Sequence, residues 1–179
     1  MLFLEFNTIN LIAVLIVAHF CNLFGMWSIH FLLHKKVFGI PFYLLHLKAH
    51  HRIDYLSDYK LNYLTLIEHM IWGMLILAYS ALYYWLFTTW IVGAFVIEAL
   101  ISTLLTYYVH LQYETKESWL SKYAWFVTGR KLHLIHHRYR PSSGSYESFI
   151  ASKNYAFGGP ITGNIMDHLA GTYEPVKPL

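Results

Sequence analysis

The sequence predicts an all-α integral membrane protein with about three transmembrane helices and a cytosolic helical cap. Of its 179 residues, 56% are hydrophobic and only 13% are charged, and the mean hydropathy is +0.39, far from an average soluble domain. The apolar residues collect in three long runs, 2–33, 64–87 and 89–111. Each run is long enough to cross the hydrocarbon core as a helix. We therefore expect one membrane-embedded domain over 1–179.

The first apolar run, 2–33, exceeds the roughly 20 helical residues that a bilayer requires. Its last turns should project beyond the lipid and carry His30 and His34 with them. The run has no basic region before it and no small-residue cleavage site, so we expect a retained anchor. The second run ends at Phe87 and the third begins at Thr89, which predicts a tight helical hairpin on the far side of the membrane.

The basic residues indicate which side of the membrane holds the cap. All 13 lysines and arginines lie between Lys35 and Lys60 or from Lys116 onward. By the positive-inside tendency, these segments face the cytoplasm. Three spans that run inward, outward and inward again then place every histidine motif on the cytoplasmic side. The short chain favours a bacterial inner membrane, with the endoplasmic reticulum as the alternative.

Nine of the 12 histidines follow spacings typical of metal ligands. They are His30, His34, His46, His50, His51, His110, His133, His136 and His137. Spacings of three or four place successive rings on one helical face, and imidazole binds iron, zinc and copper well. Adjacent histidines on a helix point about 100° apart, so the two His-His pairs could serve two metals. The number of imidazoles exceeds what one ion takes, which predicts a dinuclear centre.

Other residues complete the candidate set. The single cysteine, Cys21, excludes a disulfide framework and a cysteine-based metal site, so carboxylates are the remaining ligand class. Glu114 follows His110 by four residues and is either a metal ligand or a solvated glutamate near Lys116. His69, near the cytoplasmic end of the second run, is either a ligand, a group that orients one, or a hydrogen-bonded packing histidine.

Two ionisable residues lie deeper in the predicted spans. Glu98 is about 18 Å of helix from His110, too far to bind the same metals. We expect His19 and Glu98 to satisfy each other or another span, because intramembrane ionisable groups usually face protein or a cavity.

Near the C-terminus, a short helix is predicted at 165–170, with Gly171 as its stop. We expect Asp167 to orient a histidine or cap a turn rather than bind metal, and we leave His168 out of the ligand set.

Together these motifs resemble the membrane-bound fatty acid hydroxylase and sterol desaturase superfamily of histidine-box, non-haem di-iron enzymes. The resemblance covers about 27–173 and rests on HFLLH (30–34), HLKAHH (46–51), HLIHH (133–137) and NYAFGGPITGNIMDHLAGTY (154–173). The last segment is similar to the family's Asn-Tyr-Gly and Asp-x-x-x-Gly-Thr pattern. The chain departs from the family at Glu114 and at Leu132, where many members have further histidines.

The resemblance implies an O2-dependent oxidoreductase that hydroxylates or desaturates a lipid, such as a fatty acyl chain or sterol, in lipid biosynthesis. It implies two iron ions, with zinc able to replace them in purified protein, and O2 as co-substrate. Because the chain has no dinucleotide fingerprint and no cysteine cluster, an external donor of the ferredoxin or cytochrome b5 type must supply electrons. Basic residues could dock such an acidic donor or anionic headgroups, or simply set the topology. They include Arg130, Lys131, Arg138 and Arg140.

Three alternatives remain open. Carotenoid hydroxylases are similarly short, but the 154–173 tail fits the fatty acid hydroxylase group better. A membrane metal transporter would place ligands along a path through the bilayer, whereas these motifs gather at one interface. A non-catalytic metal-binding scaffold would tolerate loss of any one motif histidine. Nothing resembles a nucleophile elbow or a glycine-rich phosphate loop, and we expect no nucleic-acid partner.

Overall fold

The computed structural model describes residues 6–51, separate positions between 67 and 82, and residues 89–138, 151–156 and 164–176. Over these residues the chain is all-helical, with one isolated bridge between Val37 and Ile40 and no β-strand. The helices are α1 (Thr8–Leu33), α2 (Phe42–His46), the π-helix η1 (Leu47–His51), α4 (Thr89–Glu114), the 3-10 helix η2 (Trp119–Lys122), α5 (Ala124–Arg138) and α7 (Ile165–Ala170). The all-α prediction is confirmed.

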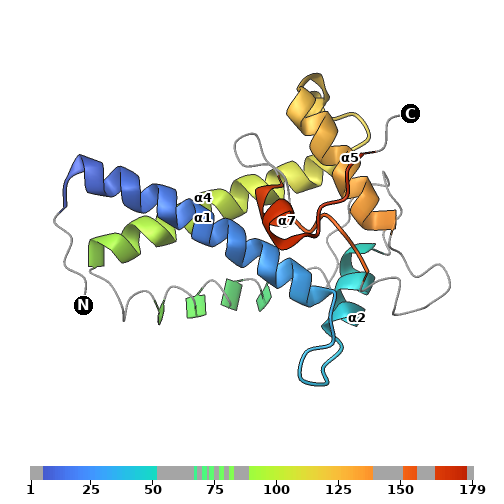
Figure 1. The fold of residues 1–179 in the computed structure, drawn as a ribbon, viewed down its shortest axis with the longest axis horizontal. Helices are drawn as coiled ribbons and strands as arrows, with labels where there is room; N and C mark the ends of the chain where they lie inside the picture. Colours follow the sequence, from blue (N-terminus) through green and yellow to red (C-terminus); the bar gives the residue numbers. More distant parts are fainter. Residues whose placement is uncertain are drawn as a thin grey trace.

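Two long helices, α1 and α4, pack side by side and form the length of the molecule (Figure 1). Thr8–Leu33 and Trp90–Glu114 are each long and apolar enough to cross a membrane. They correspond to the first and third predicted runs. The predicted second run, 64–87, falls largely outside the described residues, although its described positions are helical, and His69 lies outside them. The count of three spans therefore stays a prediction.

The ends of both long helices differ from the sequence prediction by a few residues. The helix α1 begins at Thr8 because the Asn7 side chain accepts a hydrogen bond from the Asn10 amide, at 2.9 Å, and caps the first turn. The helix α4 continues past the predicted end, Leu111, to Glu114. This extension brings the Glu114 carboxylate into the same assembly as the histidines.

A polar network joins α1 to α4 within their apolar lengths. The Glu98 carboxylate accepts hydrogen bonds from His19, at 2.7 Å, and from Asn22 and Ser102. Around it, Ala18, Ile91 and Phe95 form a small core. The expectation that His19 and Glu98 satisfy each other is confirmed, and the network fixes how the two helices face each other.

The remaining helices gather toward the end of the pair where α1 ends, and we call this part the cap (Figure 1). Tyr113 and Phe126 join α4 to α5 through a second core, and Tyr113 packs so closely on Gly129 that a Cβ there would lie 2.9 Å from its ring carbon Cζ. The short helix α7 has the predicted bounds, and Gly171 ends it in the left-handed conformation at φ +68°.

Candidate metal centre

All nine predicted histidines come together in the cap, in two groups. Within each group, all ligand atoms lie within 4.8 Å of one another. The first cluster consists of His30, His34, His46, His51 and His136. The second cluster consists of His50, His110, Glu114, His133 and His137. Each adjacent His-His pair is divided between the two clusters, because neighbouring side chains on a helix point in different directions.

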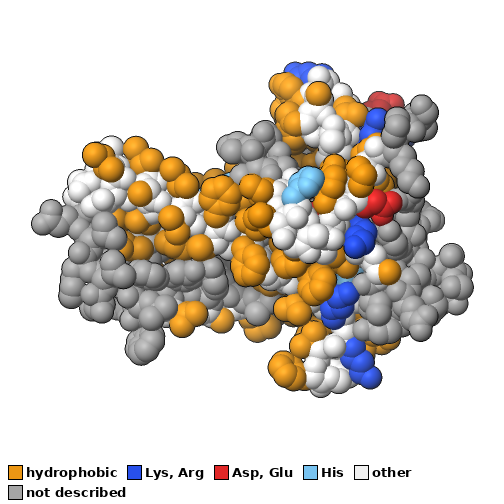
Figure 2. Space-filling view, viewed as in Figure 1, with side chains coloured by type: hydrophobic (Ala, Val, Ile, Leu, Met, Phe, Trp, Pro, Cys, Tyr) orange, Lys and Arg blue, Asp and Glu red, His pale blue; other side chains and the backbone are white. Residues whose placement is uncertain are grey.

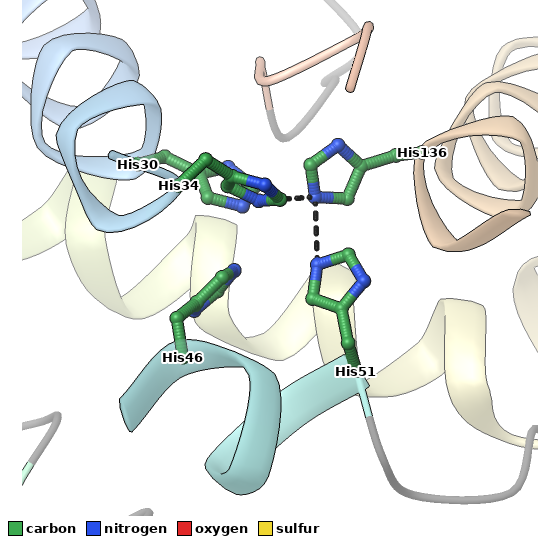
Figure 3. Close-up of side chains that lie close together, drawn as sticks. All are labelled: His30, His34, His46, His51 and His136. Atoms are coloured by element: carbon green, nitrogen blue, oxygen red, sulfur yellow. Dashed lines mark hydrogen bonds between the residues drawn. The ribbon is translucent and has the colours of Figure 1, made fainter. Parts of the chain in front are cut away.

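The first cluster draws its rings from three parts of the chain (Figure 3). His30 lies in the last turn of α1, and His34 directly follows that helix. Two more rings come from α2 and η1, and one comes from α5. The Nε2 atom of His136 lies 3.2 Å from Nε2 of His34 and 3.1 Å from Nε2 of His51. Figure 3 shows these rings pointing toward one another around a common centre.

The π-helix η1 explains which histidines share a cluster. On a regular α-helix, His46 would share a face with His50, four residues on. Instead His46 shares the first cluster with His51, five residues on, and His50 belongs to the second. A π-helix places residues i and i+5 on one face, so the wider turn of Leu47–His51 changes the partner.

Backbone carbonyls orient two rings of the first cluster. The Nδ1 atom of His30 donates to the Tyr155 carbonyl at 2.6 Å, and Nδ1 of His136 donates to the Lys153 carbonyl at 2.9 Å. A neutral imidazole that carries its proton on Nδ1 keeps a lone pair on Nε2. Both rings therefore present that lone pair to the cluster. No side-chain pattern in the sequence indicated these carbonyls.

Asp167 holds the segment that supplies the Tyr155 carbonyl. Its buried carboxylate accepts hydrogen bonds from the amides of Tyr155 and Ala156, both at 2.8 Å. It also accepts from the Thr172 hydroxyl at 2.7 Å and from the Trp27 indole at 3.1 Å. Trp27 lies one turn before His30 on α1. The Asp167 carboxylate therefore joins the 155–156 segment to the helix that carries His30. Asp167 thus positions the backbone carbonyl that contacts His30, and it belongs to neither cluster.

The second cluster contains a carboxylate among its imidazoles. The Oε1 atom of Glu114 lies 3.4 Å from Nδ1 of His50, 3.5 Å from Nε2 of His133 and 3.9 Å from Nε2 of His110. The Glu114 side chain is only 10% exposed, so it faces the histidines rather than solvent. The Nε2 atoms of His137 and His50 lie 2.9 Å apart.

Burial favours the neutral form of several cluster imidazoles. It lowers the pKa of His133 to about 3, with the charges of His46 and Arg130 adding to the effect. Burial likewise lowers the pKa of His50, His51, His136 and His137 well below the usual value, with the neighbouring histidines adding to the effect. Neutral imidazole is the form that binds metal ions. Two compact sets of buried imidazoles, one with a carboxylate, fit two transition-metal ions.

Among the described residues, two other histidines lie outside the clusters. His168 is exposed and stacks on Tyr173, with ring centroids 3.8 Å apart, which agrees with its exclusion from the ligand set. His19 belongs to the network of Glu98 between α1 and α4.

A family model described as fatty acid hydroxylase matches residues 15–172. The match includes every member of both clusters and the Asp167 segment. No curated protein and no solved structure matches the chain.

Proposed function

Because the chain belongs to the fatty acid hydroxylase family, we propose that it is a membrane-bound, O2-dependent di-iron oxidoreductase that hydroxylates, or desaturates, a lipid. The observation that carries this proposal is the pair of buried clusters, each with five ligand groups. One cluster would have served a single structural ion. Two adjacent clusters of imidazoles suit a dinuclear oxidation catalyst better.

In this proposal each cluster holds one iron ion. The first cluster binds through imidazoles alone, and the second binds through four imidazoles and Glu114. When bound, the two ions supply the activation of O2 and the removal of a hydrogen atom from a substrate C–H bond. That removal begins both hydroxylation and desaturation, and hydroxylation is the outcome we favour.

The surrounding chain orients the ligands and excludes water. The Lys153 and Tyr155 carbonyls fix two ring orientations, and the Asp167 segment covers the same side of the first cluster. The closed, water-poor surroundings protect a reactive site from side reactions. A fatty acyl chain or a sterol would enter from the bilayer, because both clusters lie in the cap at the end of the two apolar helices.

The same proposal includes membrane topology and redox partner. Two apolar helices in a chain of this family support membrane association. We place the clusters on the cytoplasmic side of a multi-pass protein on the basis of the lysine and arginine distribution, and we keep a bacterial inner membrane as the favoured compartment. A ferredoxin or cytochrome b5-type protein would deliver electrons to the basic side of the cap.

Metal analysis of anaerobically purified protein tests the centre. We expect close to two irons per chain, one for each cluster, and less in His136→Ala. The exposed His168→Ala serves as the matched control and should keep both. Chains that keep their fold but bind no metal would overturn the dinuclear site.

Lipid analysis tests the reaction. Cells that express the chain should gain a hydroxylated or unsaturated lipid, and cells that express His136→Ala should not. Unchanged lipids with an iron-loaded chain and a reduced donor present would contradict the proposed activity, and would favour the scaffold alternative.

A further inference from the structure

A tight turn between α1 and α2 presents an apolar tip to the outside. The turn Val37–Ile40 is closed by two backbone hydrogen bonds of 3.0 and 2.9 Å. Phe38 at its tip is 98% exposed, and Ile40 is 55% exposed. Phe38 also adopts φ +49°, in the left-handed region where a bulky side chain is unfavourable. Neither turn propensity nor packing within the described chain favours phenylalanine at this position.

A second exposed apolar segment lies around η2, at Trp119–Tyr123. We call the Val37–Ile40 turn the first flank and this segment the second flank. Trp119 is 57% exposed and Tyr123 is 40% exposed, and Nζ of Lys122 lies 5.3 and 5.1 Å from their ring centroids. The Trp119 indole donates a hydrogen bond to the Tyr108 hydroxyl at 2.8 Å. Tyr108 is itself exposed and follows the exposed Leu104 by one turn of α4. The flank therefore continues the outward apolar face of a candidate span.

The two flanks project from the cap in different directions, but the apolar atoms of both lie on the same side of the cap. Figure 2 shows hydrophobic atoms on the side of each projection that faces α1 and α4, and lysine or arginine atoms toward its outer edge. Lys35 and Lys36 precede the first flank, and Lys122 lies within the second. Apolar and aromatic side chains with lysines beside them are the pattern of a surface that lies at a membrane interface.

We propose that these two flanks rest in the headgroup layer of the leaflet nearest the metal clusters, with Phe38 and Trp119 as anchors. This inference rests on the membrane association in the proposed function. Anionic headgroups suit the lysines, and the ring of Trp119 suits the boundary between headgroups and acyl chains. The cap then sits directly on the bilayer, and a lipid chain reaches the clusters without crossing water.

Site-directed spin labels test this seating. The chain has one cysteine, so Cys21→Ala gives a background for Phe38→Cys and Trp119→Cys. Tyr123→Cys provides a second label on the same flank and leaves the Trp119–Tyr108 hydrogen bond in place. Matched controls are Glu117→Cys and Lys131→Cys, because both residues are exposed on the cap. The labelled chains are placed in nanodiscs of phosphatidylcholine with a minority of phosphatidylglycerol.

We expect labels at 38, 119 and 123 to collide more with O2, which dissolves in lipid, than with chromium oxalate, which stays in water. The two control labels should show the opposite preference. If the flank labels behave like the controls, the inference is overturned. Protection that appears only in native membranes would indicate a protein partner and would also overturn it. Metal content, measured on the same samples, reports separately on the proposed function.

Discussion

Single residues make the two clusters chemically different. The first cluster is formed by imidazoles alone, whereas Glu114 gives the second a carboxylate within 4 Å of three histidines. A carboxylate adds a negative charge that strengthens the binding of a cation. Removal of that charge should weaken cation binding at this buried site. The two ions should therefore respond differently to the same substitutions.

Replacement of Glu114 tests this difference. Glu114→Gln keeps the size of the side chain but removes its charge, so we expect the second cluster to lose affinity by about tenfold or more. Iron measured after dialysis against a chelator should fall from two ions toward one per chain. Glu117→Gln, at an exposed position nearby, should keep both. Equal retention by the two variants would show that Glu114 is not a ligand.

Asp167→Asn should weaken the first cluster. The amide nitrogen of asparagine cannot accept the hydrogen bond that one of the two tail amides now donates, so the Tyr155 carbonyl loses its fixed position beside His30. Loss of such an orienting partner typically lowers metal affinity about 10–100-fold. Metal titration of Asp167→Asn should show one weakened and one unchanged site. Titration of His168→Gln should show two unchanged sites. Two equally weakened sites would indicate a general packing defect instead.

Acid should destabilise the metal-free chain. The pKa of His133 is about 3 in the folded chain but about 6.5 in an unfolded one, so the unfolded state binds protons first as the pH falls. The stabilisation is complete above about pH 6.5 and is lost progressively toward pH 3. The lowered pKa values of His50, His51, His136 and His137 act in the same direction. Thermal unfolding midpoints of the chelated chain, measured across this range, should fall with pH. His133→Gln should reduce the slope, and a pH-independent midpoint would contradict the argument.

At the residue scale, the sequence predicted the nine histidines but not what orients them. Their type and spacing are visible because imidazole chemistry and helical periodicity both leave a pattern. The Lys153 and Tyr155 carbonyls leave none, because every residue has a backbone carbonyl. Regular α-helical spacing also does not predict that His46 shares a cluster with His51, because this pairing depends on a π-helix.

At the scale of elements, the contact between α1 and α4 depends on one acidic residue. Glu98 is the shared acceptor for His19, Asn22 and Ser102. The sequence predicted the His19 pairing, because an ionisable group in an apolar helix needs a partner. It did not predict the other two, because asparagine and serine occur in apolar helices for many reasons.

Glu98→Ala should loosen this helix pair. The substitution leaves three polar side chains without their common acceptor, at a cost of about 1–3 kcal/mol. The thermal unfolding midpoint in detergent should fall, whereas Ile97→Ala, at an exposed position beside it, should change it little. Equal midpoints for both variants would show that the network contributes nothing to stability. Metal content should stay at the wild-type level, because Glu98 lies far from the clusters.

At the scale of the whole molecule, the metal centre joins elements that are distant in sequence. The two clusters together take ligands from α1, α2, η1, α4 and α5. The all-α class and the two apolar helices followed directly from composition and run length. The predicted three-span topology placed all the histidine motifs on one side of the membrane. The division of their ligands into two clusters of five is visible only in the structure.

Metal removal should therefore destabilise the chain as a whole. An ion that binds only the folded state adds about 2.7 kcal/mol when its free concentration is roughly a hundredfold above its dissociation constant. Chelation should lower the unfolding midpoint of wild type strongly. A variant with one cluster disabled, such as His136→Ala, should lose less on chelation. An unchanged wild-type midpoint would mean that the cap does not depend on bound metal.

The distribution of the ligands along the chain also has a consequence for biosynthesis. Four of the five first-cluster histidines lie within the first 51 residues, and only His50 of the second cluster does. A ribosome therefore releases most of one binding site before it has made either α4 or α5. A metal ion met at that moment finds four imidazoles for the first cluster and one for the second. Under the proposed function, the first cluster could therefore take its ion during translation, whereas the second could fill only after α4 and α5 are made.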